Sequence, residues 1–277
     1  MKTIVTHIAP DLDAITSTWL IKKFYPGWAL ARVTFVPAGT TLDGKDPDLD
    51  PDIIHTDTGL GKFDHHQLDE YTSATKIIYE FLLDKEFIPK KIRTPLKRIT
   101  EFVNDIDHFA EVHFPDPDSD RYDFCLHQII LGLRVTLGDD HEVVKATFTL
   151  LDAALQLLSI KTSAELELEK GMTTQTRYGK TLILETKNQE AGKLALKKGY
   201  SCVITKDPER GYVRIKTLPD KTLDLTPVYQ KILSLDKKGS WFLHISRNML
   251  LNASSKNPHF IPTPITIAQL VSIIKGV

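Results

Sequence analysis

Aspartate and histidine residues gather at four places in the first 110 residues, and both residue types are ligands for divalent metal ions. The first group is His7-x-x-x-Asp11-x-Asp13, which brings three such side chains into seven residues. It falls where a strand over residues 3–6 is expected to end and a helix over residues 14–24 to begin. Taken alone, the pattern somewhat favours a structural interpretation, a histidine in a turn followed by Asp11 as a helix N-cap.

Three further groups follow. Asp57 comes directly after a β-rich run at residues 52–56, where an Asx-turn is the alternative explanation. Residues 64–66 read Asp-His-His, and imidazole beside carboxylate suits Mn²⁺, Mg²⁺ or Fe²⁺, with the imidazole favouring Mn²⁺. Asp105 and Asp107 lie on or at the end of an expected helix. Because they are two residues apart they cannot both face one partner, so one is expected to be a ligand and the other a solvated charge.

The spacing of expected elements suggests that the four groups converge. Strands are expected at 3–6, 31–36 and 52–56, with the helix at 14–24 between the first two. Such alternation predicts a parallel sheet, and ligands bind at the carboxyl ends of parallel strands. Coincidence is a poor explanation for four groups at such positions, so a metal site is predicted there.

The remaining pattern predicts an α/β chain of two domains. After the sheet, a helical extension is expected, with helices at 73–83, 92–112, 124–133 and 142–158. Residues 165–179 are polar and predict a connector. Beyond it, strands at 181–185, 202–205, 212–217 and 241–246 and helices at 189–198, 227–235 and 265–274 predict a smaller α/β domain. The expected domains are therefore 1–165, which carries the metal site, and 180–277.

Composition favours a soluble cytoplasmic protein. The net charge is −1, from 35 basic and 36 acidic residues, so no global field attracts nucleic acid, although a local basic patch is compatible with it. Cys125 and Cys202 lie in apolar stretches and are expected to be buried thiols in a reducing compartment. No signal peptide and no apolar run near about 20 residues is apparent, so no membrane association is expected.

The four groups together resemble the motifs of the DHH phosphoesterase superfamily, which includes RecJ-like exonucleases, oligoribonucleases and manganese-dependent pyrophosphatases. Here they read THIAPDLDA, HTDTG, FDHHQ and NDIDHF. The third motif is most similar to the branch that contains the melanocyte proliferating gene exonuclease. Alignment to that branch places Asp107, rather than Asp105, on the metal-binding aspartate. The chain departs from the superfamily in lacking a GGHxxAAG-type substrate motif.

The resemblance implies a parallel-sheet DHH-type domain with two divalent ions, Mn²⁺ in preference to Mg²⁺. One ion would be held by His7, Asp11 and Asp57, and the other by Asp13, Asp57, His65 and Asp107. Asp57 would thus bridge the ions and take part in catalysis. His66 would hydrogen-bond a phosphoryl oxygen or protonate the leaving group, and Asp64 would orient a histidine.

The second domain is expected to bind substrate. A polar loop offers Arg247, Asn248, Asn252 and Ser254 to phosphate, although a solvated loop is an equal alternative. The predicted activity is hydrolysis of phosphodiesters in nucleotides or short oligonucleotides. A small-molecule phosphatase or pyrophosphatase and a non-catalytic metal- or nucleotide-binding regulator are the alternatives. An HD-type hydrolase fits poorly, because here Asp64 precedes His65. No protein partner is apparent, and a homodimer is left open because dimers are common in the superfamily.

Overall fold

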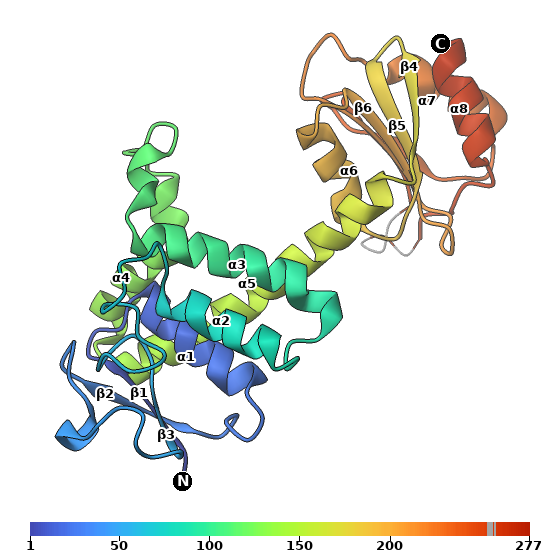
Figure 1. The fold of residues 1–277 in the computed structure, drawn as a ribbon. Coiled ribbons are helices and arrows are strands. Elements are labelled where there is room, and N and C mark those ends of the chain that lie inside the picture. Colours follow the sequence, from blue (N-terminus) through green and yellow to red (C-terminus); the bar gives the residue numbers. More distant parts are fainter. Residues whose placement is uncertain (254–256, 258) are drawn as a thin grey trace. The chain divides into compact units, whose positions relative to one another are not determined.

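The chain forms two compact units, Met1–Ser159 and Ile160–Val277, in a computed structural model that describes residues 1–253, 257 and 259–277 (Figure 1). The first contains a small parallel sheet and the second a larger mixed sheet. The fold is therefore mixed α/β, as predicted.

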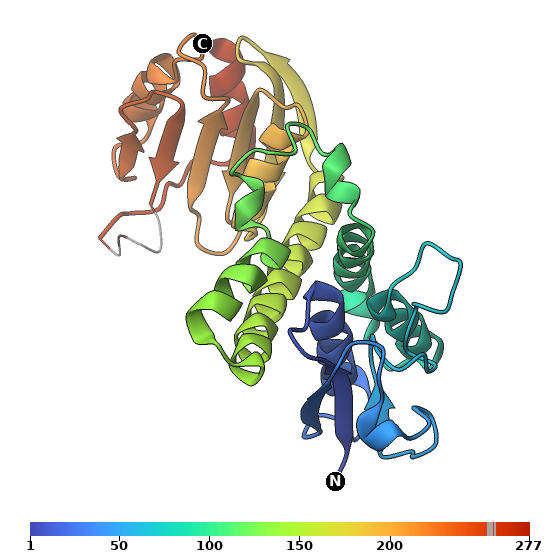
Figure 2. The same ribbon diagram turned by 90° about the vertical axis from the view of Figure 1, so that its left-hand side faces the viewer.

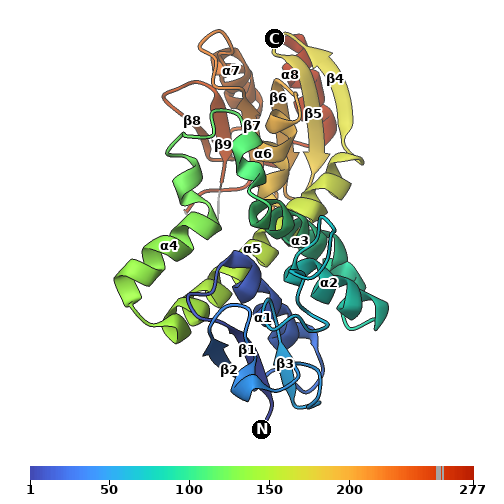
Figure 3. The ribbon, with the colours of Figure 1, turned by 60° about the vertical axis from the view of Figure 1, so that its left-hand side comes forward.

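The first sheet has three parallel strands in the order β2-β1-β3 (Figure 3). β1 (Thr3–His7) lies in the centre, with β2 (Arg32–Val36) and β3 (Ile53–His55) on its two sides. The register pairs Val5 with His55, so β1 and β3 end at the same edge of the sheet.

Five helices complete the first unit, and the last of them continues into the second. They are α1 (Leu12–Phe24), α2 (Ala74–Asp84), α3 (Arg93–Asp107), α4 (Leu126–Leu137) and α5 (Asp140–Leu168). Short 3₁₀ turns lie at Leu42–Gly44, Lys90–Ile92, Ala110–His113 and Tyr122–Phe124. α1 is buried at every position from residue 12 to 21, which shows that it is surrounded by other elements. Its burial fixes the start of the helix, where two of the predicted ligands lie.

The long helix α5 differs from expectation, because it is long and apolar enough, by length and composition alone, to cross a membrane. Yet Val143, Leu151 and Leu155 pack in the core of the first unit. Asp152, in the middle of the helix, accepts hydrogen bonds from the Trp19 indole and the Lys23 ammonium group. These contacts are typical of a helix that packs inside a folded domain.

The second sheet has six strands in the order β4-β5-β6-β7-β9-β8 (Figure 2). They are β4 (Met172–Thr176), β5 (Gly179–Glu185), β6 (Cys202–Lys206), β7 (Val213–Thr217), β8 (Trp241–Leu243) and β9 (Met249–Asn252). Within this sheet, β5 and β6 form the only parallel pair among the described strands, and the other described pairs are antiparallel. α6 (Gln189–Lys197) packs on one face, while α7 (Thr226–Leu235) and α8 (Ile267–Gly276) pack on the other.

Several predicted boundaries in this unit are wrong. The expected connector at 165–179 contains the end of α5 and strand β4, whose polar residues fit the exposed edge of a sheet. The expected substrate loop contains β9, which pairs with both β7 and β8. Cys125 is half-buried rather than buried, while Cys202 is buried and burial raises the pKa of its thiol to about 12.

Candidate metal centre

Strands β1 and β3 deliver the first two side chains of the centre. His7 is the last residue of β1, and Asp57 follows β3 by two residues. The His7 Nε2 atom lies 3.4 Å from one Asp57 carboxylate oxygen, Oδ2. Asp57 adopts a φ of 57°, a left-handed conformation that is uncommon for a residue with a side chain. Such local strain is found at functional sites more often than elsewhere.

The other oxygen of Asp57 faces a second histidine. Asp57 Oδ1 lies 3.3 Å from His65 Nε2, which in turn lies 3.5 Å from Asp107 Oδ2 and 3.9 Å from Asp13 Oδ2. One carboxylate therefore contacts two histidines from different motifs. This arrangement is the one expected of a bridging ligand.

The described residues form three groups of donor atoms that could hold a metal ion, each with all its atoms within 4.8 Å of one another. The groups are His7, Asp11 and Asp57; Asp13, His65 and Asp107; and Asp57, His65 and His66. The six predicted metal ligands are thus brought together. The first two groups divide them as the motif resemblance implies, apart from the shared Asp57.

Asp11 and Asp13 also fix helix ends. Asp11 Oδ1 accepts a hydrogen bond from the Ala14 amide at 3.0 Å, which makes it the N-cap of α1. Both carboxylate oxygens of Asp13 accept backbone amides at the start of α2, from Ala74 and Thr75, at 2.8 Å each. The structural and the metal-binding interpretations of Asp11 are therefore compatible, because only one oxygen makes the cap.

The third motif is held together by Asp64. This buried carboxylate accepts the Leu60 amide at 2.7 Å and lies 2.7 Å from His66 Nδ1. The His66 side chain is 58% exposed. Asp64 therefore orients His66 through Nδ1, which also lies 3.8 Å from Asp57 Oδ1.

The two aspartates of the fourth motif point to different partners. Asp107 faces His65, whereas Asp105 accepts a hydrogen bond from the Tyr71 hydroxyl at 3.1 Å. Because they are two residues apart on α3, their side chains leave the helix in different directions. Asp107 is therefore the aspartate of this motif that faces His65, and its role as a metal ligand stays a prediction.

Two buried atoms at the centre make no hydrogen bond to any described residue. They are Asp57 Oδ1 and His65 Nε2, the pair that approach each other at 3.3 Å. Buried polar atoms without a partner are costly and need an explanation. A divalent cation would satisfy both, and a set of carboxylate oxygens with imidazole nitrogens suits Mn²⁺ or Mg²⁺. The residues therefore fit such an ion.

The charges of the centre are strongly coupled. Burial alone would lower the pKa of His7, but Asp57, Ile8 and Asp11 raise it to about 9. The Asp57 carboxylate raises the pKa of His65 to about 9 as well. Burial and the neighbouring carboxylates raise the pKa of Asp107 to about 6. In the metal-free chain, protons on the histidines thus balance part of the carboxylate charge.

Side chains from α4 and α5 support the centre, and the sequence analysis did not find them. The Asp140 carboxylate accepts the Ala9 amide at 2.9 Å, and the Arg134 guanidinium donates to the Ala9 carbonyl. Ala9 lies between His7 and Asp11 with a φ of 52°. The two contacts therefore hold the loop of the first motif in its unusual conformation.

A cavity of about 270 Å³ adjoins the centre, lined on one side by Asp11, Asp13 and Asp107 and on the other by Glu111, His127 and Arg134. His127 Nε2 lies 3.0 Å from Glu111 Oε2, while Arg134 Nε is buried and makes no bond to a described residue. His127 and Arg134 are seven residues apart, which places them on one face of α4. This polar spacing in an apolar helix is the signal that could have indicated them.

The predicted substrate residues of the second unit have other partners. Asn252 is fully buried, and its amide bonds Ser240, Ile261 and Thr263. The Asn248 amide nitrogen donates to Thr217, Asp220 and Leu223. Both therefore hold the strand ends together, and their expected contact with substrate stays a prediction. Arg247 is exposed and pairs with Asp224 at 3.0 Å. Ser254 lies outside the described residues.

Residues 4–158 match the family described as ChrB, C-terminal domain, and this is more than half of the chain. The chain belongs to this family. All six residues of the metal centre lie inside the range that matches the ChrB C-terminal domain, as do His66 and Arg134. The family match stops at the end of the first unit and does not extend to the second.

A solved structure, RecJ from Thermus thermophilus in complex with Mg²⁺, is similar to this ChrB-family chain at 12% sequence identity and a TM-score of 0.32. The similarity covers 99% of this chain and 49% of the RecJ chain, so the present chain spans about half the length of that relative. No curated protein matches the chain.

Proposed function

We propose that the chain is a metal-dependent hydrolase of phosphate esters, which acts on phosphodiester bonds in nucleotides or short oligonucleotides. The observation that carries the proposal is the position of Asp57. Its two oxygens face histidines of two separate donor groups, at 3.4 and 3.3 Å. A carboxylate shared by two such groups is typical of sites that hold a pair of divalent ions.

The residues divide between two ions, for which Mn²⁺ is the first choice and Mg²⁺ the second. The sets would be His7, Asp11 and Asp57 for one ion, and Asp13, Asp57, His65 and Asp107 for the other. When bound, such ions polarise a phosphoryl oxygen and lower the pKa of a nearby water.

The chain itself supplies a proton donor. Nδ1 of His66 donates to the Asp64 carboxylate, so Nε2 can donate a hydrogen bond to a phosphoryl oxygen or a proton to the leaving oxygen when the imidazole is doubly protonated. The imidazole is exposed enough to reach a substrate. Arg134, in the adjoining cavity, would position the substrate phosphate, because a guanidinium binds phosphate oxygens in pairs.

The size and charge of the site support short substrates. The adjoining cavity, at about 270 Å³, suits a group of nucleotide size. A net charge of −1 gives no long-range attraction for a duplex. Because pyrophosphate needs few cations for binding, the same site is also compatible with pyrophosphatase activity. Parallel assays distinguish the two activities.

The test is hydrolysis by the full chain after removal of metal with EDTA and addition of Mn²⁺. Bis-p-nitrophenyl phosphate, a labelled dinucleotide and pyrophosphate are offered in parallel. The proposal predicts diester and dinucleotide cleavage that requires Mn²⁺ and is lost in Asp57→Asn. Asp105→Asn is the matched control, because Asp105 lies beside the candidate ligand Asp107 in the fourth motif but faces Tyr71.

Cleavage of pyrophosphate alone would show that the chain is a pyrophosphatase and not a diesterase. Turnover of the diester by Asp57→Asn at the native rate would contradict the proposed role of the centre. Binding of Mn²⁺ without turnover of any of the three substrates would favour a metal-binding regulator.

A further inference from the structure

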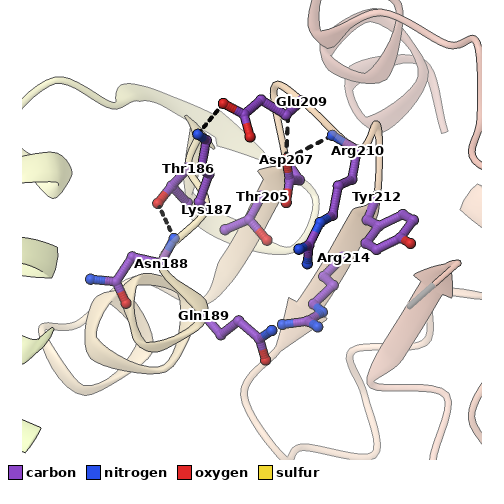
Figure 4. A pocket seen from close by; sticks show the side chains of 10 residues that line it. All are labelled: Thr186, Lys187, Asn188, Gln189, Thr205, Asp207, Glu209, Arg210, Tyr212 and Arg214. Atoms are coloured by element: carbon purple, nitrogen blue, oxygen red, sulfur yellow. Dashed lines mark hydrogen bonds and ion pairs between the residues drawn. The ribbon is translucent and has the colours of Figure 1, made fainter. Parts of the chain in front are cut away.

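The second unit contains a cavity of about 280 Å³ that the metal centre does not use (Figure 4). It lies at the carboxyl ends of β5 and β6, the parallel pair, where Glu185 stands beside Lys206 in the register. The first residue of α6, Gln189, lines it. All of its lining residues belong to the unit Ile160–Val277. The carboxyl ends of parallel strands and the start of a helix are places where anions bind.

The cavity is rich in cationic side chains. Lys187, Arg210 and Arg214 line it, and Figure 4 shows the two guanidinium groups on the same side, with the Gln189 amide beside Arg214. Arg214 is half-buried, and its guanidinium makes no hydrogen bond or ion pair with any residue that the structure describes. A half-buried cation without a partner has lost hydration that nothing in the protein replaces.

A further cation, Lys216, extends this surface. Lys216 lies two residues after Arg214 on β7 and therefore on the same face of the sheet. Lys216 and Arg214 also line a smaller adjoining hollow together with Gln189. Burial, with Arg214 and Lys193 nearby, lowers the pKa of Lys216. Arg214 and Lys216 therefore place two cationic groups on one face of the sheet.

The neighbouring carboxylates have partners of their own. Asp207 accepts the backbone amides of Glu209 and Arg210 at 2.9 Å each. The Glu209 carboxylate pairs with Lys187, and Glu190 pairs with Lys193 at 2.7 Å. Arg210, Arg214 and Lys216 are therefore left without a described counter-ion at the cavity.

Hydroxyl and aromatic groups surround the cations. Thr205 lies between Lys187 and Arg210 in Figure 4, and the Tyr212 ring lies on the other side of Arg210. A guanidinium pair suits the oxygens of a phosphate, and an aromatic ring offers a surface for a planar group. The volume fits a ligand group of about mononucleotide size.

We propose that this cavity binds a phosphorylated small molecule of about mononucleotide size, with its phosphate between Arg210 and Arg214. The proposal does not depend on the hydrolysis proposed for the first unit, since every residue that carries it lies in the second.

The test is calorimetric titration of the full chain, treated with EDTA and without divalent ions, with AMP, inorganic phosphate and adenosine. We expect AMP to bind, phosphate to bind more weakly, and adenosine not to bind. Arg214→Gln should weaken AMP binding by about tenfold or more, because a charge-assisted contact is lost. Arg214→Lys should recover part of the affinity. Lys231→Gln, an exposed charge change on α7, should leave it unchanged.

Asp57→Asn separates this site from the metal centre, and it should bind AMP as the native chain does. Should Arg214→Gln fail to fold, as judged by circular dichroism, Arg210→Gln in the exposed turn replaces it. The proposal is overturned if none of the ligands binds, or if adenosine binds as well as AMP. Equal AMP affinity in the native and cavity variants, or loss of binding in Asp57→Asn, would also overturn it.

Discussion

Single residues at the centre serve both the fold and the chemistry. Asp11 caps α1 with one oxygen and belongs to a donor group, while Asp13 receives two amides of α2 and belongs to another. Helix starts are rich in unpaired N–H groups, which hold a carboxylate in place. The packing of α1 and α2 therefore positions the candidate ligands before any ion binds.

His66 is the residue whose change should separate catalysis from metal binding. His66→Gln keeps a polar side chain next to Asp64 but removes the acid and base. We expect turnover of the diester to fall by about 100-fold or more, with Mn²⁺ affinity nearly unchanged. Steady-state kinetics and metal titration on the same preparation check this. A loss of Mn²⁺ affinity equal to the loss of turnover would make His66 a ligand instead.

Proton release should accompany metal binding. His7 and His65, with pKa values of about 9, carry protons at neutral pH in the metal-free chain and must lose them to bind an ion. The affinity for Mn²⁺ should therefore rise as pH increases from 6.5 toward 9 and become constant above that range. Titrations in buffers of different ionisation enthalpy measure the protons released. An affinity independent of pH in this range would contradict the assignment of the histidines.

At the scale of elements, the loop after β3 is the most constrained part of the centre. Gly59 has a φ of 83°, and a Cβ built there would lie 2.8 Å from the Thr41 Cγ2 atom. This glycine follows Asp57 by two residues, so a shift of the loop would move the bridging carboxylate.

Gly59→Ala should lower the free energy of unfolding by roughly 1–3 kcal/mol, because of backbone strain and close contact. Urea unfolding measures the change. Gly132→Ala is the matched control: Gly132 lies inside α4 with open space around it, so alanine there should stabilise the chain by roughly 0.5–1 kcal/mol. Equal stability of Gly59→Ala and the native chain would show that the loop accommodates a side chain.

The first-unit elements could be predicted because their signals are local. Alternating strand and helix patterns located β1, α1 and β3 to within about two residues, and the motifs lay at their ends. The supporting contacts could not be predicted in the same way. Asp140 binds Ala9 across 131 residues, and no local pattern encodes such a contact.

The second unit was harder to interpret for a related reason. Asn252 stands in a polar stretch that suggests a solvated loop, yet it is buried and joins three chain segments. β4 is polar because one of its sides is exposed at the sheet edge. In both cases contacts with distant parts of the chain determine the local structure, whereas the local composition suggested loops.

At the scale of the whole molecule, metal binding should stabilise the fold. An ion that binds only the folded chain adds about 2.7 kcal/mol at 100 times its dissociation constant. The melting temperature should therefore rise with Mn²⁺ in the native chain but not in Asp57→Asn, as followed by scanning calorimetry. A rise of equal size in both proteins would mean that the ion binds elsewhere.

The metal-free chain should show the opposite dependence on pH. The folded pKa values of His7 and His65 lie above the unfolded value of 6.5, so their stabilising effect is complete below pH 6.5 and is lost as pH rises toward 9. The free energy of unfolding in EDTA should fall by on the order of 1 kcal/mol per pH unit for each histidine in this window. Constant stability there would contradict the coupling between these histidines and Asp57.

The measurement that tests the central claim most directly is anomalous diffraction from crystals of the full chain soaked in Mn²⁺. The account predicts two peaks that share Asp57, one also about 2 Å from His7 and Asp11 and the other about 2 Å from His65 and Asp107. A well-ordered Asp57 with no anomalous peak beside it would contradict the metal centre and the hydrolytic function built on it.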